Sequence, residues 1–288
     1  MLVSPRSWAA ARLAYALETS SAEQRAALGL YLPVGYPTHE SSLDALHLMA
    51  QSADILELGV PHPEPHLDGP VIARAGAQAL DNGFRMDSLF ATAIELTAST
   101  TVALLVMAYW SSIEDYGPLS FARRLAAAGG AGVLVPDLPP AAASAWQRIA
   151  HDEGLYTITL IPPHASTAQL TAIGAQTSGM VYAPATPGLT GTRRPLSPHL
   201  PRLVGRLRTA TRLPVAVGIG IGTPDQAAQA SSYADAVVVG SAVIRYMQAQ
   251  PNRPALAAAD AARDFAAGVR RAQRPSSGLP ACRSARHA

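Results

Sequence analysis

Eight short apolar runs rich in β-forming residues recur along the 288-residue chain, separated by stretches with helical periodicity. We expect strands over 28–34, 54–58, 102–108, 132–135, 156–161, 179–183, 214–217 and 236–239. The helical stretches between them are 40–52, 86–99, 119–128, 141–153, 166–173, 198–209 and 224–231. Such alternation favours a parallel sheet, and eight units favour closure. We therefore predict the α/β class, as a single (β/α)8 TIM barrel.

Three further helices complete the predicted domain. A leading helix over 7–19 is expected to cover the barrel bottom, and short extra helices over 71–81 and 241–250 lie near strand ends, at the C-terminal face. We assign 1–272 to the barrel domain, and 273–288, rich in Ser, Pro, Gly and Arg, to a disordered C-terminal tail. The arginine-rich segment 270–286 is counted with that tail. An open doubly wound sheet is the alternative fold, but no G-x-G-x-x-G opens a helix after the first strand.

All 22 basic residues are arginine, and the absence of lysine limits the chemistry. A retro-aldol reaction through a lysine Schiff base is excluded, as is a pyridoxal phosphate site anchored by this chain. We expect no cofactor and no metal.

Charge and cysteine content describe the expected surroundings of the protein. The net charge of +2 is scattered, so we expect no nucleic-acid partner, and no apolar stretch is long enough for a membrane span. Residues 1–14 lack the pattern of a signal peptide, and the single cysteine, Cys282, leaves no disulfide to form. These features predict a cytoplasmic protein.

Glu57 is a carboxylate near the C-terminal end of an apolar strand. Strand alternation puts it on one face with Ile55, either inside the barrel or against the helices. A buried carboxylate raises its pKa or finds a partner, so a catalytic role and an ion pair with an arginine are both open.

A proline-rich loop leads from Glu57 to Asp68. Asp68 precedes Gly69-Pro70 and a helical run, where an aspartate commonly serves as a cap or turn residue. His62 and His66 have the spacing of metal ligands on a helix, but the prolines of the loop argue against a helix here. The alternatives are a solvated loop or histidines at a pocket mouth.

Glycines gather where the last three strands end. They form the elements 186–191, 218–224 and 240–241, and Thr223 in the second has the position of a helix cap. Barrels commonly bind phosphate with the loops after strands 7 and 8 and a helix N-terminus, where backbone N–H groups hold the anion. Gly218, Gly220, Gly240 and Ser241 are therefore candidate phosphate-binding residues.

Together these residues resemble the tryptophan synthase α subunit family, which splits indole-3-glycerol phosphate into indole and glyceraldehyde 3-phosphate. The resemblance runs from about 28 to 247 and is strongest in LELGVP at 56–61, LDGP at 67–70, GLTG at 188–191, GIG at 218–220 and VGS at 239–241. YLPVGYP at 31–37 also resembles the family's first strand and loop.

The resemblance implies a role for each matching residue. Glu57 is implied as general acid and base, Asp68 as the group bonded to the indole nitrogen, and Tyr182 as a neighbour of the substrate. Thr190 is implied as a loop residue that closes over the site and touches Asp68. The implied phosphate contacts are Gly191, Gly220, Gly240 and Ser241. Protonation of indole C3 would develop positive charge toward the N–H, where Asp68 would stabilise it.

The family also implies a β subunit as partner, in an αββα complex. The segment 62–66 (HPEPH) departs from the family's usual aromatic residue, Ser, Asp, Pro and small residue, and Ser111-Ser112 stands where many members have Asn-Pro. In the family, that aspartate and that asparagine lie toward the β subunit. We therefore expect lower or absent stimulation by a β subunit.

Three other functions remain open. One is a free-standing indole-producing lyase of secondary metabolism, with weakened β-subunit coupling. Another is a catalytically weak subunit that activates a partner, which the intact Glu57 and Asp68 disfavour. The last is another phosphate-binding barrel, such as an isomerase of indole or ribulose phosphates, which the Glu57-to-Asp68 loop disfavours.

Overall fold

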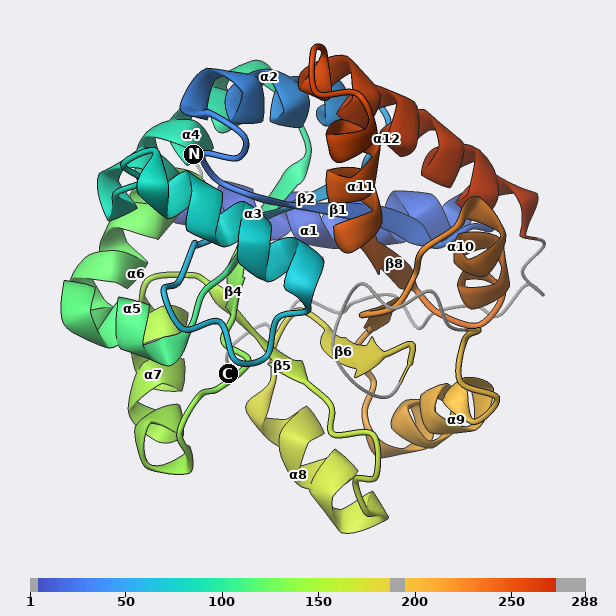
Figure 1. Cartoon of the computed structure of the whole chain (residues 1–288). Coiled ribbons are helices and arrows are strands. Elements are labelled where there is room, and N and C mark those ends of the chain that lie inside the picture. The colour runs from blue at the N-terminus through green and yellow to red at the C-terminus, as the bar shows by residue number, and fades with distance from the viewer. Residues whose placement is uncertain (1–4, 187–194, 273–288) are drawn as a thin grey trace.

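A computed structural model describes residues 5–186 and 195–272, and its centre is a closed barrel of eight parallel strands in chain order (Figure 1). The strands are β1 (Ala27–Pro33), β2 (Ile55–Gly59), β3 (Ala103–Met107), β4 (Gly132–Leu134), β5 (Tyr156–Leu160), β6 (Val181–Pro184), β7 (Val215–Gly218) and β8 (Ala236–Val239). Pairing of β1 with β8, with Gly29 opposite Val238, closes the sheet. The predicted barrel is therefore confirmed over the open sheet, and each predicted strand lies within two residues of an observed one.

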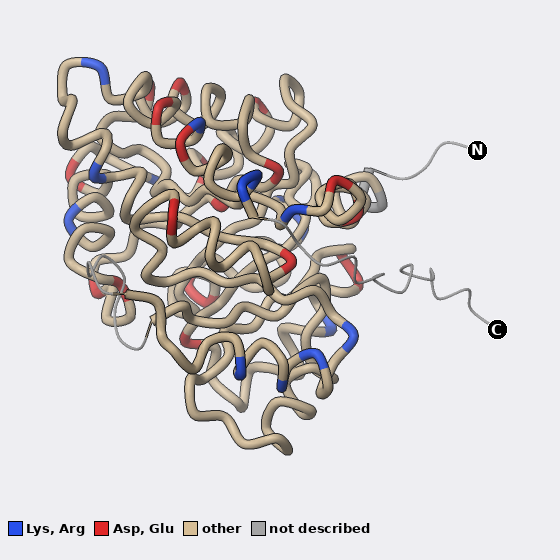
Figure 2. Tube along the Cα trace, turned by 90° about the vertical axis from the view of Figure 1, so that its right-hand side faces the viewer, with Lys and Arg blue, Asp and Glu red and all other residues tan. Residues whose placement is uncertain are grey.

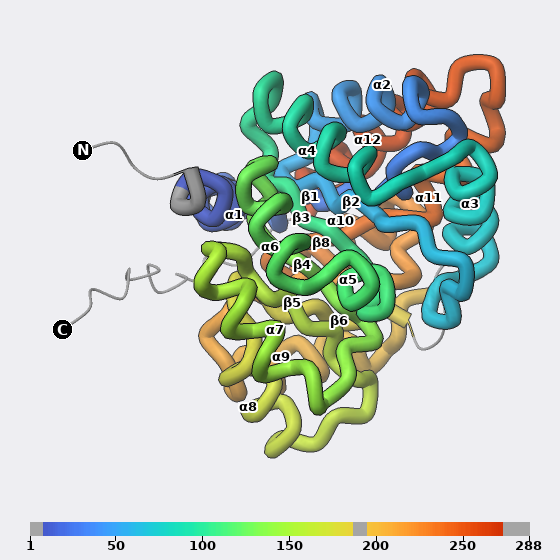
Figure 3. Tube along the Cα trace, turned by 90° about the vertical axis from the view of Figure 1, so that its left-hand side faces the viewer, coloured from blue at the N-terminus to red at the C-terminus, as the bar shows by residue number. Residues whose placement is uncertain are grey.

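Helices surround the closed ring of strands (Figure 1). They are α1 (Pro5–Ala22), α2 (His39–Ala50), α3 (Pro70–Asp81), α4 (Met86–Ser99), α5 (Trp110–Tyr116), α6 (Pro118–Ala127), α7 (Pro140–Asp152), α8 (Thr167–Gln176), α9 (Leu200–Ala210), α10 (Pro224–Ser231), α11 (Ser241–Ala249) and α12 (Pro254–Arg271). As predicted, α1 lies at the opposite end of the barrel from α3 and α11 (Figure 3).

Two of these helices were not predicted. The short α5 follows β3, and the 18-residue α12 fills the ring between β8 and β1, where it packs against α2, α10 and α11. Alanines dominate its buried face together with Phe265, and Gly268 lets the backbone approach Pro224, whose carbonyl oxygen would lie 2.4 Å from an added Cβ. The segment is amphipathic, with charged residues opposite its alanines, but it has few large apolar side chains, and the predicted elements end at residue 250.

The assignment of 270–286 to a tail is corrected at its start. Arg270 and Arg271 form the last turn of α12, and the Arg271 guanidinium donates a 2.7 Å hydrogen bond to Asp225. The tail predicted for 273–288 lies outside the described residues, so that domain boundary stays a prediction.

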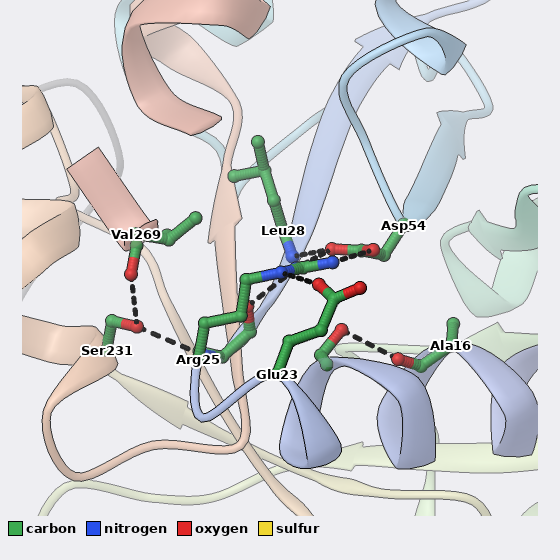
Figure 4. Close-up of polar contacts among 9 residues, drawn as sticks. Ala16, Glu23, Arg25, Leu28, Asp54, Ser231 and Val269 are labelled. Atoms are coloured by element: carbon green, nitrogen blue, oxygen red, sulfur yellow. Dashed lines mark hydrogen bonds and ion pairs between the residues drawn. The ribbon is translucent and has the colours of Figure 1, made fainter. Parts of the chain in front are cut away.

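Arg25 and Asp54 join strand ends at the barrel bottom (Figure 4). The guanidinium of Arg25 donates to both oxygens of Asp54, at 2.5 and 2.8 Å, and Asp54 also accepts the backbone N–H of Leu28 at 2.7 Å. This ion pair connects the residue before β2 with the start of β1, at the N-terminal ends of the strands.

Charged residues of both signs are spread over the molecule (Figure 2). None of the helices in the described parts of the chain is long and apolar enough to cross a membrane.

Candidate active site

A cavity of about 670 Å³, which includes its open mouth, lies at the C-terminal ends of the strands. Glu57 from β2, Tyr31 from β1 and Tyr182 from β6 line it together with Asp68, which enters from the loop before α3. Further lining residues come from the other strand ends and loops: Leu67, Ile72, Met107, Leu134, Pro136, Leu160, Ile219, Gly220, Ile221, Val238, Gly240 and Ser241. Its size and mostly apolar wall fit a small ligand with an aromatic part.

Glu57 points into the barrel, which settles the question that strand alternation left open. It is only 5% exposed, and no ion pair joins it to any residue that the structure describes, so the alternative of an arginine partner finds no support. Burial, and secondarily the charge of Asp68, raises the pKa of Glu57 from 4.5 to about 8. The side chain is therefore a protonated acid near neutral pH and can donate a proton.

Asp68 faces the same cavity and does not cap the helix that follows it. The N-cap of α3 is Gly69, without a side-chain cap bond, and α3 begins with Pro70. The cap interpretation is therefore wrong, although the backbone N–H of Asp68 does close a turn onto Pro65. Burial raises the pKa of Asp68 to about 6, against the opposing effect of a positive charge on His66. Asp68 thus ionises at lower pH than Glu57.

Two buried tyrosines complete the polar part of the cavity, and each requires a glycine. A Cβ at Gly59 would lie 2.3 Å from the hydroxyl oxygen of Tyr31, and one at Gly218 would lie 1.9 Å from that of Tyr182. Burial raises the pKa of both tyrosines well above the ordinary value, so their hydroxyls stay protonated. Gly218, predicted as a phosphate contact, therefore makes room for Tyr182.

The other predicted phosphate residues meet at one side of the cavity. Gly220 has φ +109°, and its neighbour Ile219 has φ +57°, a strained value for a branched side chain. Gly240 precedes α11, and Ser241 is the first residue of that helix, whose first N–H groups have no acceptor within the helix. A helix N-terminus beside a turn of this kind binds anions. Thr223 caps α10 as predicted, accepting from Gln226 N–H at 3.2 Å.

Among the other residues considered from the sequence, His62 and His66 do not line the cavity. Thr190 and Gly191 lie outside the described residues. His62 and His66 lie on the loop, where their rings pack on Tyr109 at centroid distances of 4.8 and 5.1 Å. Over the described part of the chain, no three His, Cys, Asp or Glu side chains gather as a metal site.

Sequence reasoning did not select Tyr31 as a site residue. It faces the cavity because it lies opposite Glu57 in the β1–β2 register, and the register becomes known only when the barrel closes. A signal was present, since Tyr31 alternates with apolar residues on the first strand. Nothing in the sequence distinguished its inward face from its outward face.

Comparison with known proteins places this arrangement in a family. The family model described as tryptophan synthase alpha chain matches residues 17–271. The chain belongs to the tryptophan synthase alpha chain family. The alpha chain of Acidothermus cellulolyticus is 43% identical over 258 residues, which are 89% of this chain and 96% of that protein. The alpha chain of Streptomyces avermitilis is 41% identical over 257 residues, covering 88% and 93% of the two chains.

Solved structures of the family share the fold. A chain of Mycobacterium tuberculosis tryptophan synthase superposes with a TM-score of 0.82 at 38% identity, covering 90% of this chain and 98% of that one. Membership identifies the chain as a lyase of tryptophan biosynthesis that cleaves indole-3-glycerol phosphate.

Proposed function

We propose that Glu57 and Asp68 carry out the cleavage of indole-3-glycerol phosphate to indole and glyceraldehyde 3-phosphate in the cavity at the barrel mouth. The observation that carries the proposal is the separation of two pKa values within one cavity, about 8 for Glu57 and about 6 for Asp68. Near neutral pH this gives one protonated acid and one carboxylate, the pair that the reaction requires.

Glu57 acts first as an acid and then as a base. Its carboxylic acid delivers a proton to the indole C3 carbon, and the carboxylate so formed takes the proton from the glycerol hydroxyl next to the bond that breaks. The electron pair of the C3–carbon bond returns to the indole ring, the hydroxyl carbon becomes an aldehyde, and Glu57 ends protonated. No net proton is consumed.

Asp68 stabilises the charge that appears between these two steps. Protonation of C3 places positive charge on the indole nitrogen, and the ionised carboxylate of Asp68 accepts a hydrogen bond from that N–H. The apolar side chains of Met107, Leu134 and Leu160 offer the ring a dry environment, in which this interaction is stronger than in water.

The phosphate group binds on the side of the cavity formed by Gly220, Gly240 and Ser241. Backbone N–H groups and the α11 dipole supply the positive potential, so no lysine is needed. Thr190 and Gly191 belong to this proposal through the family resemblance. The proposal includes Tyr182 as a neighbour of the substrate, and its position on the lining of the same cavity supports this role.

The proposal includes a tryptophan synthase β subunit as partner and a cytoplasmic location. The partnership is supported by membership of the family and by the likeness to Mycobacterium tuberculosis tryptophan synthase. A reducing compartment suits a chain with a single cysteine.

The test is indole release from indole-3-glycerol phosphate by the isolated wild-type chain and by Glu57→Gln and Asp68→Asn. We expect each variant to lower kcat by about 100- to 10,000-fold, because each loses a proton-transfer or charge-stabilising group. Glu95→Gln on α4 and Asp81→Asn at the end of α3 are exposed and make the same chemical changes as matched controls. Wild-type-like activity of both site variants would overturn the mechanism.

A further inference from the structure

The loop that carries Asp68 rests on one buried aromatic side chain, Tyr109, at the end of β3. Tyr109 is 1% exposed, and its hydroxyl accepts the backbone N–H of Leu67, the residue before Asp68, at 3.0 Å. The rings of His62 and His66 both pack on the Tyr109 ring, so three separate contacts hold this loop to one side chain. The backbone directly after Tyr109 is also held in place, because the Trp110 N–H donates a 2.8 Å hydrogen bond to Asp137 Oδ1.

His62 adds a polar connection between the loop and α5. Its Nδ1 accepts the backbone N–H of Glu64 at 3.0 Å, and its Nε2 lies 2.8 Å from the Ser111 hydroxyl oxygen. Since Nδ1 is occupied as an acceptor, the proton of the neutral ring sits on Nε2, which therefore donates to Ser111. One imidazole thus hydrogen-bonds within its own loop and also joins the loop to the first turn of α5.

We propose that the His62–Ser111 hydrogen bond is a latch that positions Asp68 for the reaction. His62 and Ser111 are positioning residues, since they act through the loop backbone rather than by touching substrate. Asp68 must meet the indole nitrogen within hydrogen-bond distance, and Leu67 is 39% exposed, so little burial of its own holds this part of the loop. The latch and the Tyr109 contacts restrict the backbone instead, which lowers the entropy lost when Asp68 is fixed in its productive place.

The latch and the phosphate site should affect different kinetic constants. The phosphate residues lie on the β7 and β8 loops, whereas the latch joins the loops that follow β2 and β3. Loosening the latch should therefore lower kcat, which depends on the position of Asp68, while it changes KM little. This inference rests on the proposed function because kcat is read from indole release.

A double-mutant cycle tests the latch in the full-length chain. His62→Phe keeps an aromatic ring on Tyr109 and removes both polar contacts, whereas Ser111→Ala removes only the hydroxyl. We expect each variant to lower kcat by about 3- to 10-fold, the range for loss of one hydrogen bond, with KM changed by less than about 2-fold. The double variant should be no worse than His62→Phe, since Ser111→Ala removes only the hydrogen bond that His62→Phe has already removed.

The chain contains a matched control for these substitutions. His47 on α2 and Ser99 on α4 form a pair with the same atoms at the same 2.8 Å, far from the cavity. His47→Phe and Ser99→Ala should leave kcat within about 1.5-fold of wild type, because surface changes of this kind are close to neutral.

Amide hydrogen exchange gives a readout that is independent of the reaction. Exchange across 62–68 should accelerate in His62→Phe and Ser111→Ala and stay unchanged in the control pair. Additive effects in the cycle, or faster exchange with an unchanged kcat, would overturn the latch. A wild-type chain that releases no indole would instead overturn the proposed function and leave the exchange result to stand by itself.

Discussion

Glu57 shows how a single residue can oppose the stability of the fold that holds it. Its carboxyl group is buried among apolar side chains with no ion pair to any described residue, and this raises its pKa to about 8. The same burial that makes it a proton donor near neutral pH makes its ionised form costly. Activity and stability should therefore respond to pH in different ways.

The pH profile of kcat/KM should be a bell with limbs near the two pKa values. Below about 6, Asp68 takes up a proton and no longer stabilises positive charge on the indole ring. Above about 8, Glu57 loses the proton that it must deliver. Because each carboxyl affects the other, the limbs belong to the pair. A rate that continued to rise beyond the alkaline limb would contradict Glu57 as the acid.

Glu57→Gln should stabilise the protein, and more so as pH rises. Between pH 4.5 and about pH 8, the folded protein keeps the Glu57 proton while the unfolded chain loses it. The free energy of unfolding of the wild type therefore falls as pH rises through this window. Glutamine has no such proton, and its advantage in free energy of unfolding should grow across this window to a few kcal/mol, on the order of 2–4. Urea unfolding at several pH values measures this. An equal trend in the exposed Glu95→Gln variant would contradict the assignment to Glu57.

At the scale of elements, the strands are fastened at the end of the barrel opposite the site. Side chains just before one strand accept backbone N–H groups from the neighbouring strand: Asp54 from Leu28, Ser178 from Thr157, and Asp235 from Val215. Arginines pair with two of these acceptors, Arg25 with Asp54 and Arg208 with Asp235. The bottom of the barrel thus supplies stability while the mouth carries groups that reduce it.

Asp54→Ala should destabilise the chain strongly without changing the reaction. It leaves the Arg25 guanidinium, 11% exposed, with the exposed Glu23 as its remaining ionic partner, and the Leu28 N–H without its acceptor. We expect a loss of about 3–5 kcal/mol in free energy of unfolding, with kcat per folded molecule unchanged. Asp87→Ala breaks an exposed pair with Arg124 and should cost less than about 1 kcal/mol. Similar losses in both variants, measured by chemical denaturation, would contradict this account.

At the scale of the whole molecule, two residues bear on how strongly a β subunit would stimulate the chain. Glu64 and Ser111 are exposed, and both depart from the residues common in the family at positions that the family resemblance places toward the β subunit. We expect binding of a β subunit to raise kcat less than it does for the α chain that naturally pairs with it.

Titration of the isolated chain with a β subunit, followed by indole release, measures this stimulation. Glu64→Asp restores the family's usual residue and leaves the latch side chains in place, so it should increase the fold stimulation. Full, tight activation of the unmodified chain would contradict the expectation.

The order of strands and helices was determined by the sequence alone, because each strand is a local apolar run and most helices have an amphipathic period. Glu57 was also identifiable, since a carboxylate near the end of an apolar strand conflicts with its surroundings. The long α12 was not predicted although its sequence is amphipathic, because its buried face consists mainly of alanine rather than large apolar side chains. Its packing against α2, α10 and α11 is a property of the folded chain.

Only the tertiary structure decided how these elements meet. Closure of β8 onto β1 sets the register, and the register places Tyr31 beside Glu57 and Tyr182 over Gly218. Folding also makes Asp68, a possible helix cap in the sequence, a buried carboxylate with a raised pKa. It brings His62 within hydrogen-bond distance of Ser111, 49 positions away. Burial and contacts between distant segments are properties of the folded chain, and they govern the pKa values and positions on which the proposed chemistry depends.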